Sequence, residues 1–584
     1  MSQATRKHRR LRPYAWLGVS AVTLGLGASM VSGAAVAAAD AGVDTSSTTT
    51  SSAAASTVGT ATSSTTSRRG PRNPRSAVSA AAAGGIEPRQ SRGVAAAVPA
   101  PAVADVTAAT PAIAAPVTAS PAPAGAVVSR RRAAAVRPST AQAVSAPSAA
   151  ANPAATVTPT DPPFIPNNIV PGQHVTLALN EISAGQTALT QATWGAGDIA
   201  AGIAAVVPQL FMAEAQLSLT LWQNNMPGAQ QLVAATAGIP IIQQLTEVNL
   251  FVTATLPTFA QVGLNGAALF LPLVSLFGAA TAPTQELINR AKSDGTVYAV
   301  IPIQMKYVSE PVVTASIGGG PRTSLLIDTG SSGLVTTLDQ LGSGAVATDQ
   351  TGTITYSGAS DTPFTYRVYA TNVDFGNGAV TGTTYVDVIE DTPAQVAAFK
   401  DFVASTGSNG VLGTGAAAVG PGPGYIPTSQ LPGELSDGYL LNESVFLGLF
   451  GVMVFGPNPF PARVTVPGSP YGQLKIQIGN NTPQSVTDAI IDSGGVFGTM
   501  PASLFTDPVI GGQVPAGTKI SVYTQDGQTL LYSYTTNSSN GPTIVPDDPL
   551  GMDVNTGYIP FNQQLIYTDY SAAYPNGATV FDIA

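Results

Sequence analysis

The spacing of apolar residues divides this chain into regions of different kinds. Between residues 160 and 290, Leu, Ile and Val recur at broadly helical spacing, for example from Leu177 to Leu221. A proline removes a backbone donor and clashes with the preceding turn, so we expect several short helices here. The interrupting prolines are Pro208, Pro227, Pro240, Pro257 and Pro272.

From about Val297 onward the pattern changes to short alternating or β-branched runs, separated by Gly, Asn, Asp and Pro turns. Strands of a half-buried sheet show this alternation, so residues 291–584 are predicted to form a mainly β domain. We expect its first lobe at about 297–455 and its second at about 456–584.

The apolar region 159–290 has two interpretations. It is either a small helical domain that packs on the β domain or a module that associates with the cell envelope or a partner. The apolar stretch 266–278 is short and contains Pro272, so we do not expect it to span a membrane. No residue of the region indicates catalytic chemistry.

The first 39 residues have the pattern of a secretory signal. A basic segment at 6–12 precedes an uncharged run from Ala15 to Ala39, which ends in small residues. This run is long enough to span a bilayer, so an uncleaved anchor is the alternative. Its Ala- and Gly-rich composition makes insertion into a bilayer only weakly favourable, so we favour a cleaved signal over an anchor.

Residues 40–158 consist mainly of Ala, Ser, Thr and Pro, with scattered Arg and no aromatic residue. Such a composition cannot bury enough apolar surface to offset the entropy lost on ordering. We therefore predict a disordered tether between the export signal and the rest of the chain. The protein is expected to be exported, and secreted or held at the cell surface or envelope.

The amino-acid composition limits which side chains can take part in catalysis. The 584 residues include two His and no Cys, which excludes thiol nucleophiles, disulfides and thiolate metal sites. Neither His8 nor His174 lies near a candidate site, which argues against a Ser-His-Asp triad. We expect no metal and no cofactor, so catalysis must rely on carboxylates, hydroxyls, a few amines or backbone amides.

Charge argues against a nucleic-acid partner. Residues 1–150 carry 15 Lys and Arg against 4 Asp and Glu, and the remainder carries 9 against 29. The folded part is therefore acidic at −20, with too few basic residues to form a surface that neutralises phosphates.

Two passages of the β region are similar to each other. Residues 324–334 read SLLIDTGSSGL and residues 488–497 read DAIIDSGGVF, so that each buried-type strand ends in Asp-Thr/Ser-Gly. The two aspartates, Asp328 and Asp492, are 164 residues apart, which indicates a duplicated lobe. One such tripeptide is an ordinary turn sequence, but a pair in equivalent settings is specific.

These motifs resemble the pepsin-like aspartic proteases, and within them the mycobacterial PE cleavage protein A group. Residues 353–358, TITYSG, resemble the flap hairpin, and residues 410–413, GVLG, resemble the element beside the first catalytic loop. The sequence 555–557, NTG, lies where the second such element would fall. The resemblance covers about residues 297–584 and includes no PE domain; the signal and tether stand in its place, so self-processing of a PE domain is not expected.

The resemblance implies a bilobal fold with Asp328 and Asp492 as the catalytic pair. It implies supporting roles for the hydroxyl and glycine positions around them and a substrate-binding flap. The supporting residues are Thr329, Gly330, Ser331, Ser493 and Gly494, and the flap residues are Tyr356, Ser357 and Gly358.

Two carboxyl groups held a few ångströms apart cannot both ionise cheaply, so they share a proton and can act as general base and general acid. Ser331 can donate a hydrogen bond to the outer oxygen of Asp328, whereas Gly495 occupies the matching position in the second loop. We therefore expect Asp492 to lack an outer hydrogen bond and to be the protonated partner.

These observations predict an exported, monomeric aspartic endopeptidase that binds extended polypeptides. Its expected substrates are surface or secreted proteins, with PE-type proteins among the candidates. The main alternative is a catalytically inactive, β-rich cell-surface adhesin or binding protein. A glycosidase could also use two carboxylates, but that class does not explain the paired strand–Asp–hydroxyl–Gly units.

Overall fold

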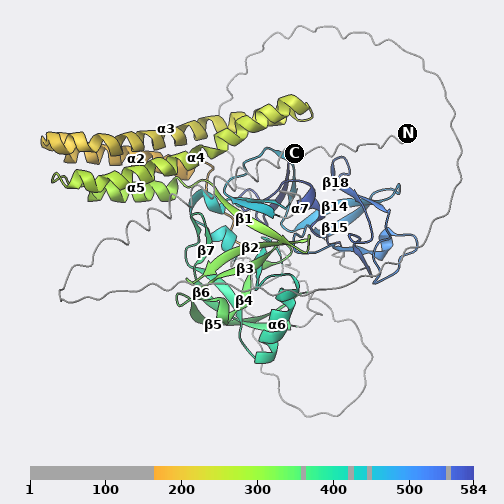
Figure 1. Cartoon of the computed structure of the whole chain (residues 1–584). Coiled ribbons are helices and arrows are strands. Elements are labelled where there is room, and N and C mark those ends of the chain that lie inside the picture. The colour runs from red at the N-terminus through yellow and green to blue at the C-terminus, as the bar shows by residue number, and fades with distance from the viewer. Residues whose placement is uncertain (1–163, 357–362, 419–425, 444–449, 548–553, 584) are drawn as a thin grey trace, which may run out of the picture. The chain divides into compact units, whose positions relative to one another are not determined.

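The computed structural model describes residues 164–356, 363–418, 426–443, 450–547 and 554–583. The predicted signal (1–39) and tether (40–158) lie outside these residues, as do the flap residues Ser357 and Gly358. Figure 1 shows the described elements: helices come first in the chain, and a β-rich domain follows.

Four α-helices precede the β domain. Helix α3 packs along α4, while α2 packs against α5 and α3. The helices are α2 (Gln173–Ala192), α3 (Ile199–Thr236), α4 (Pro240–Ser275) and α5 (Ala282–Asp294), with a 3₁₀ turn η1 (Trp194–Ala196) after α2.

The expectation of several short helices is wrong for α3 and α4, which contain 38 and 36 residues. Each continues through two internal prolines, and one proline of each helix, Pro208 in α3 and Pro257 in α4, is buried. An internal proline costs a helix one hydrogen bond. Here the apolar packing between α3 and α4 offsets that cost.

The first half of the β domain supplies most of a 15-stranded sheet. Its central strand β3 lies between β2 and β10 and is mostly buried. The elements are β1 (Ala299–Lys306), β2 (Glu310–Ile317), β3 (Arg322–Asp328), β4 (Ser332–Thr337), β5 (Val346–Thr355), β6 (Pro363–Thr371), β7 (Val373–Gly376), β8 (Ala379–Val380), β9 (Thr384–Ile389), α6 (Pro393–Ser405) and β10 (Val411–Thr414).

The second half adds a four-stranded sheet, ordered β15-β14-β17-β18, and the parallel pair β16-β19. Strands β11, β12, β13, β20 and β21 join β1 in the larger sheet and so connect the two halves. The elements are β11 (Gly438–Asn442), β12 (Phe450–Phe455), β13 (Ala462–Pro467), β14 (Tyr471–Ile478), β15 (Gln484–Ile490), β16 (Thr499–Pro501), β17 (Lys519–Thr524), β18 (Leu530–Thr535), β19 (Thr543–Val545), α7 (Ile559–Gln563), β20 (Ile566–Asp569) and β21 (Ala578–Asp582).

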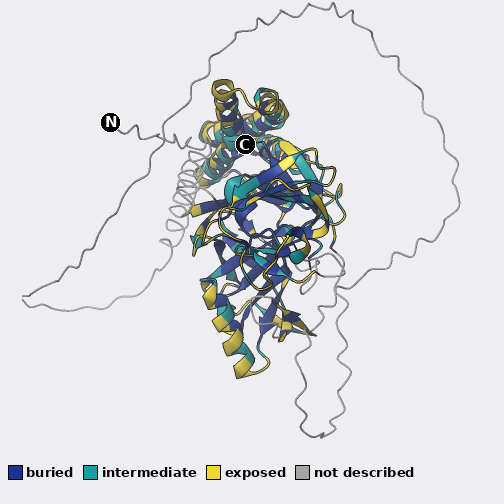
Figure 2. Ribbon diagram, turned by 90° about the vertical axis from the view of Figure 1, so that its right-hand side faces the viewer, coloured by how far each residue is buried: buried dark blue, intermediate teal, exposed yellow. Residues whose placement is uncertain are grey.

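The helices share a hydrophobic core with the β domain. Leu440, Leu565 and Val580 of the β domain belong to the same buried cluster as the inner faces of α2–α5. The backbone N–H of His174 in α2 donates to the buried Glu434 carboxylate at 3.0 Å. Figure 2 shows buried residues along the inner strands and exposed residues on the outer helix faces.

The prediction of a mainly β domain preceded by helices is confirmed. The domain boundaries proposed from the sequence remain predictions.

Candidate active site

The two aspartates lie at equivalent positions of the two halves. Asp328 is the last residue of β3, and Asp492 follows β15 by two residues. Strand β10 pairs with β3 in parallel, so that Gly413 lies opposite Asp328, as expected for the 410–413 element. Asn555 occupies the corresponding place in the second half, where it bridges Ile490 and Thr499.

The hydroxyl residues after the two aspartates join the loops. The Thr329 hydroxyl donates to the carbonyl oxygen of Ile491 at 2.8 Å and accepts from the backbone N–H of Ser493 at 2.8 Å. Reciprocally, the Ser493 hydroxyl donates to the carbonyl oxygen of Ile327 at 2.8 Å and accepts from the N–H of Thr329 at 3.2 Å. These four buried bonds fix each loop relative to the other.

Gly330 and Gly494 allow the carboxyl groups to approach each other. A Cβ atom on Gly330 would lie 2.6 Å from Cγ of Asp492, and one on Gly494 would lie 3.0 Å from Oδ1 of Asp328. Each glycine therefore faces the aspartate of the opposite loop, and any side chain there would collide with it. The two carboxyl groups thus lie close enough for the charge of Asp492 to raise the pKa of Asp328.

The carboxylate of each aspartate accepts two hydrogen bonds. Asp328 accepts from the N–H of Gly330 at 2.8 Å and from the hydroxyl of Ser331 at 2.6 Å. Asp492 accepts from the N–H of Gly494 at 2.9 Å and from the Asn555 amide, whose Nδ2 lies 2.6 Å from Oδ2.

The expectation that Asp492 lacks an outer hydrogen bond is therefore wrong. Asn555 supplies the bond that Ser331 supplies to Asp328. A Cβ atom at Gly495 would lie 2.2 Å from Oδ1 of Asn555, so the glycine leaves room for the amide. The glycine at position 495, where the first loop has Ser331, indicates that the two loops differ. The residue that replaces the serine as donor, Asn555, lies 60 residues further along the chain.

The electrostatics of the site oppose ionisation of Asp328 beside Asp492. Burial, and then the neighbouring charge of Asp492, raises the pKa of Asp328 well above its usual range, while the Ser331 hydroxyl opposes the shift. Both side chains are nearly buried, at 9% and 7% exposure, so the repulsion is weakly screened.

Tyr356 directly follows β5, which pairs with β6 in an antiparallel hairpin. The centroid of its ring lies 5.2 Å from that of Phe402 of α6, on which it stacks, and its buried hydroxyl has no hydrogen-bond partner among the described residues. Burial, followed by the charge of Asp328, raises the pKa of Tyr356, so its hydroxyl stays protonated. The structure thus brings the predicted flap tyrosine to the first catalytic loop.

The sequence reasoning also missed two buried carboxyl groups near Asp492. Burial, and then the charge of Asp492, raises the pKa of Glu310 to about 8. Burial, followed by the charges of Glu310 and Asp492, raises the pKa of Glu443, which is fully buried. Neutral carboxyl groups here keep further negative charge away from the pair. Nothing in the local sequence distinguishes these glutamates from surface residues.

No group of three or more His, Asp or Glu residues is placed to hold a metal ion in the described part of the chain. The arrangement offers two neighbouring carboxyl groups with a hydroxyl and an amide donor on their outer oxygens. Such a pair can activate water and protonate a leaving group. A β domain whose two Asp-hydroxyl-Gly loops meet in this way defines the aspartyl peptidase-like class.

Comparisons with known proteins agree with this class. Residues 299–579, just under half of the chain, match the family described as the PE-PGRS C-terminal aspartyl peptidase-like domain. PE cleavage protein A from Mycobacterium tuberculosis is 40% identical over 307 residues, covering 48% of this chain and 51% of the relative. Its Mycobacterium marinum counterpart is 38% identical over 313 residues, with 48% and 52% covered.

The chain therefore spans about half the length of the curated relatives it matches. Among solved structures, an aspartic proteinase from Irpex lacteus matches at 15% identity and a TM-score of 0.36. It covers 49% of this chain and 98% of that one.

Proposed function

We propose that the protein is an aspartic-type endopeptidase in which Asp328 and Asp492 activate water. Asp492 takes a proton from the water as its oxygen attacks the carbonyl carbon of the scissile peptide. Protonated Asp328 donates a hydrogen bond to the carbonyl oxygen. As the C–N bond breaks, a proton passes to the leaving nitrogen, which departs as the amine.

The observation that carries this proposal is the close approach of the two carboxyl groups, which face the glycines of the opposite loops, with the loops held by reciprocal bonds between Thr329 and Ser493. These bonds hold the reacting groups in position before the substrate binds. Such prior positioning lowers the activation barrier of the reaction. Both aspartates come from one chain, which supports a monomeric enzyme. The β5–β6 hairpin next to the pair is the proposed flap over an extended polypeptide substrate.

Replacing either aspartate tests the activity. Asp328→Asn and Asp492→Asn should each lower kcat/KM on a fluorogenic peptide pool by at least about 10³-fold, with melting temperature and circular dichroism showing a folded chain. A statine-type transition-state mimic should inhibit the parent protein. Retention of cleavage by both variants would instead support the binding-protein alternative.

We also propose that the protein acts outside the cytoplasm on surface or secreted proteins. Support comes from the basic and uncharged N-terminal segments and from relatives named PE cleavage protein A. PE-type proteins are therefore the first substrates to test. Exported proteins of a strain carrying Asp328→Ala should retain uncleaved forms that the parent strain lacks, whereas identical profiles would argue against this substrate class.

Helices α3 and α4 support an association with the cell envelope. By length and composition alone, both are long and apolar enough to cross a membrane, although about a third of each apolar window is buried. Together they carry only two charged residues, Glu214 and Glu247. We propose that their exposed apolar faces contact lipid. Leu210→Gln combined with Leu245→Gln should reduce co-sedimentation with lipid vesicles, and unchanged binding would contradict this role.

A further inference from the structure

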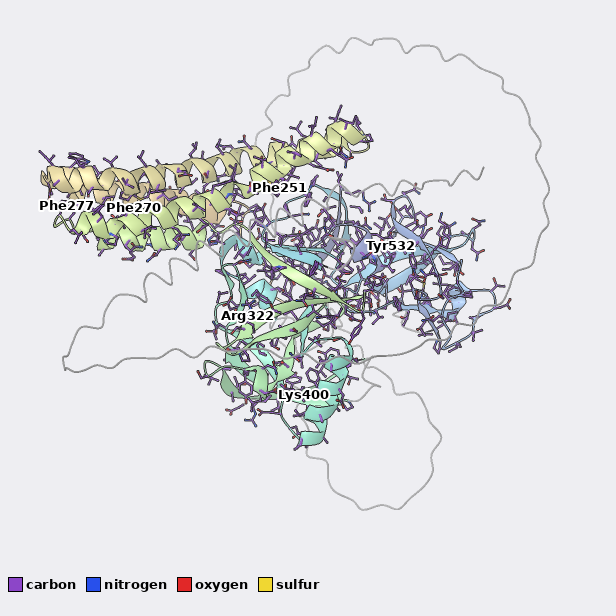
Figure 3. The ribbon with its side chains drawn as sticks, in the orientation of Figure 1. Phe251, Phe270, Phe277, Arg322, Lys400 and Tyr532 are labelled. Atoms are coloured by element: carbon purple, nitrogen blue, oxygen red, sulfur yellow. The ribbon has the colours of Figure 1, made fainter. Side chains whose placement is uncertain are left out.

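A cavity of about 490 Å³ lies between α4 and the β domain, remote in sequence from both catalytic loops. Its helical wall is one face of α4 from Glu247 through Ala254 to Asn265. At about 1.5 Å per residue, these 18 steps span roughly 27 Å. In Figure 3, Phe251 marks where α4 approaches the strands, whereas Phe270 and Phe277 lie farther along the helices.

The lining is mostly apolar. The strand side consists of the beginning of β1, β11, β12 and neighbouring loop residues, many of which belong to buried clusters. These lining residues include Val297, Ala299, Leu440, Val452, Val454, Phe460 and Leu565. A volume of this size falls within the range of small-molecule sites, about 300–1,000 Å³. The shape along α4 suits one extended chain.

The two charged residues of the lining are Glu247 and Lys292. Lys292, near the end of α5, is a lining residue, and Gln261 donates to its carbonyl oxygen at 2.9 Å. Lys292 forms no ion pair with any of the described residues, and burial lowers the pKa of its ammonium group. At the other end of the α4 wall, the Glu247 carboxylate accepts from Gln243 at 2.9 Å. The cavity therefore offers a cation that lacks a carboxylate partner among the described residues.

We propose that this cavity binds a single-chain anionic amphiphile, a long-chain fatty acid, with its acyl chain along α4 and its carboxylate at Lys292. Apolar walls favour the methylene chain, and the partly buried ammonium group favours an anion over a neutral or cationic head. The exposed apolar faces of α3 and α4 would bring the mouth of the site to a lipid environment. The inference does not depend on the proposed peptidase activity.

Displacement of a fluorescent fatty acid from the full-length protein tests the site. Affinity should rise with chain length from C8 to C16, and palmitate should bind more tightly than hexadecanol or hexadecylamine. Lys292→Ala should weaken palmitate binding by about tenfold, and Lys292→Arg should restore it. Lys519→Ala, at an exposed strand position, is the matched control and should bind as the parent does.

A second variant tests the location independently of charge. Ala254→Phe places a ring into the cavity from the middle of α4 and should abolish saturable binding while leaving the melting temperature of the unliganded protein close to that of the parent. Three results would overturn the proposal: no saturable palmitate binding, equal affinity for palmitate and hexadecylamine, or parental affinity in Ala254→Phe.

Discussion

Asn555 and Gly495 form a complementary pair: one supplies a hydrogen bond to Asp492, and the other leaves the space for it. Asn555→Ala should lower kcat/KM roughly 10- to 100-fold, the cost of losing a hydrogen bond to a charged group. The single variant Gly495→Ser should also lose activity because the Cβ atom of the serine would collide with the side-chain amide of Asn555. Peptide-cleavage kinetics across pH measure both effects.

The double variant Gly495→Ser/Asn555→Ala provides the decisive comparison. The serine hydroxyl then has room to reach Asp492, so activity should recover above that of either single variant. If the activity loss of the double variant, expressed as a free energy, equals the sum of the losses of the two single variants, Asn555 does not act by positioning Asp492.

Ser331 sets how readily Asp328 ionises. Its hydroxyl donates to Asp328 at 2.6 Å and stabilises the charged form, so Ser331→Ala should raise the pKa of Asp328 further. In the proposed mechanism Asp328 must be protonated, so activity should be lost as the pH rises through that pKa. The alkaline limb of the pH–rate profile should therefore move upward by about one unit in the variant, whatever happens to kcat. A limb that stays in place would contradict this role.

The sequence could predict Asp328, Asp492 and the hydroxyls that join their loops, because each follows its own strand in a short repeated pattern. It could not predict the source of the second outer bond. Asn555 reaches Asp492 only after the chain has folded through β16–β19, and no local spacing connects them. The buried state of Glu310 and Glu443 depends likewise on distant strands.

At the scale of elements, two helix glycines offer a matched test of the α3–α4 contact. A Cβ atom at Gly263 in α4 would lie 2.8 Å from the carbonyl oxygen of Phe211, whereas one at Gly228 in α3 meets nothing within 4 Å. Gly263→Ala should destabilise the protein by about 1–3 kcal/mol, and Gly228→Ala should stabilise it by roughly 0.5–1 kcal/mol.

Thermal unfolding followed at 222 nm measures both changes. If the two alanines shift the melting temperature in the same direction, the close approach at Gly263 does not limit the packing of α3 on α4.

The same helices show why the apolar pattern predicted helix but misplaced the ends. The prediction that a helix ends at a proline considers only the local cost of that proline and not the packing of the whole helix. Pro208 and Pro257 are instead buried in long helices, where packing along the whole length compensates for a missing hydrogen bond. The strands were easier to predict because their turns contain Gly, Asn and Asp at nearly every reversal.

For the molecule as a whole, buried carboxyl groups predict greater stability in acid. Burial raises the pKa of both Glu310 and Asp437 to about 8, from ordinary values of 4.5 and 3.8. The folded state therefore holds protons that the unfolded state has released, so the free energy of unfolding falls as the pH rises between about 4 and 8. The melting temperature should drop by at least about 5 °C from pH 5 to pH 8.

Glu310→Gln should reduce this drop because the amide carries no charge to bury. Glu286→Gln changes a glutamate whose side chain is 71% exposed and should leave the drop unchanged. A melting temperature that rises with pH in the parent protein would contradict the assignment.

The reciprocal bonds between Thr329 and Ser493 link residues 164 positions apart. Contacts of such sequence separation form late, after loop-closure entropy has been overcome. A chain whose two halves have not yet folded together would consequently contain both aspartates without the braced pair on which the proposed peptidase activity depends.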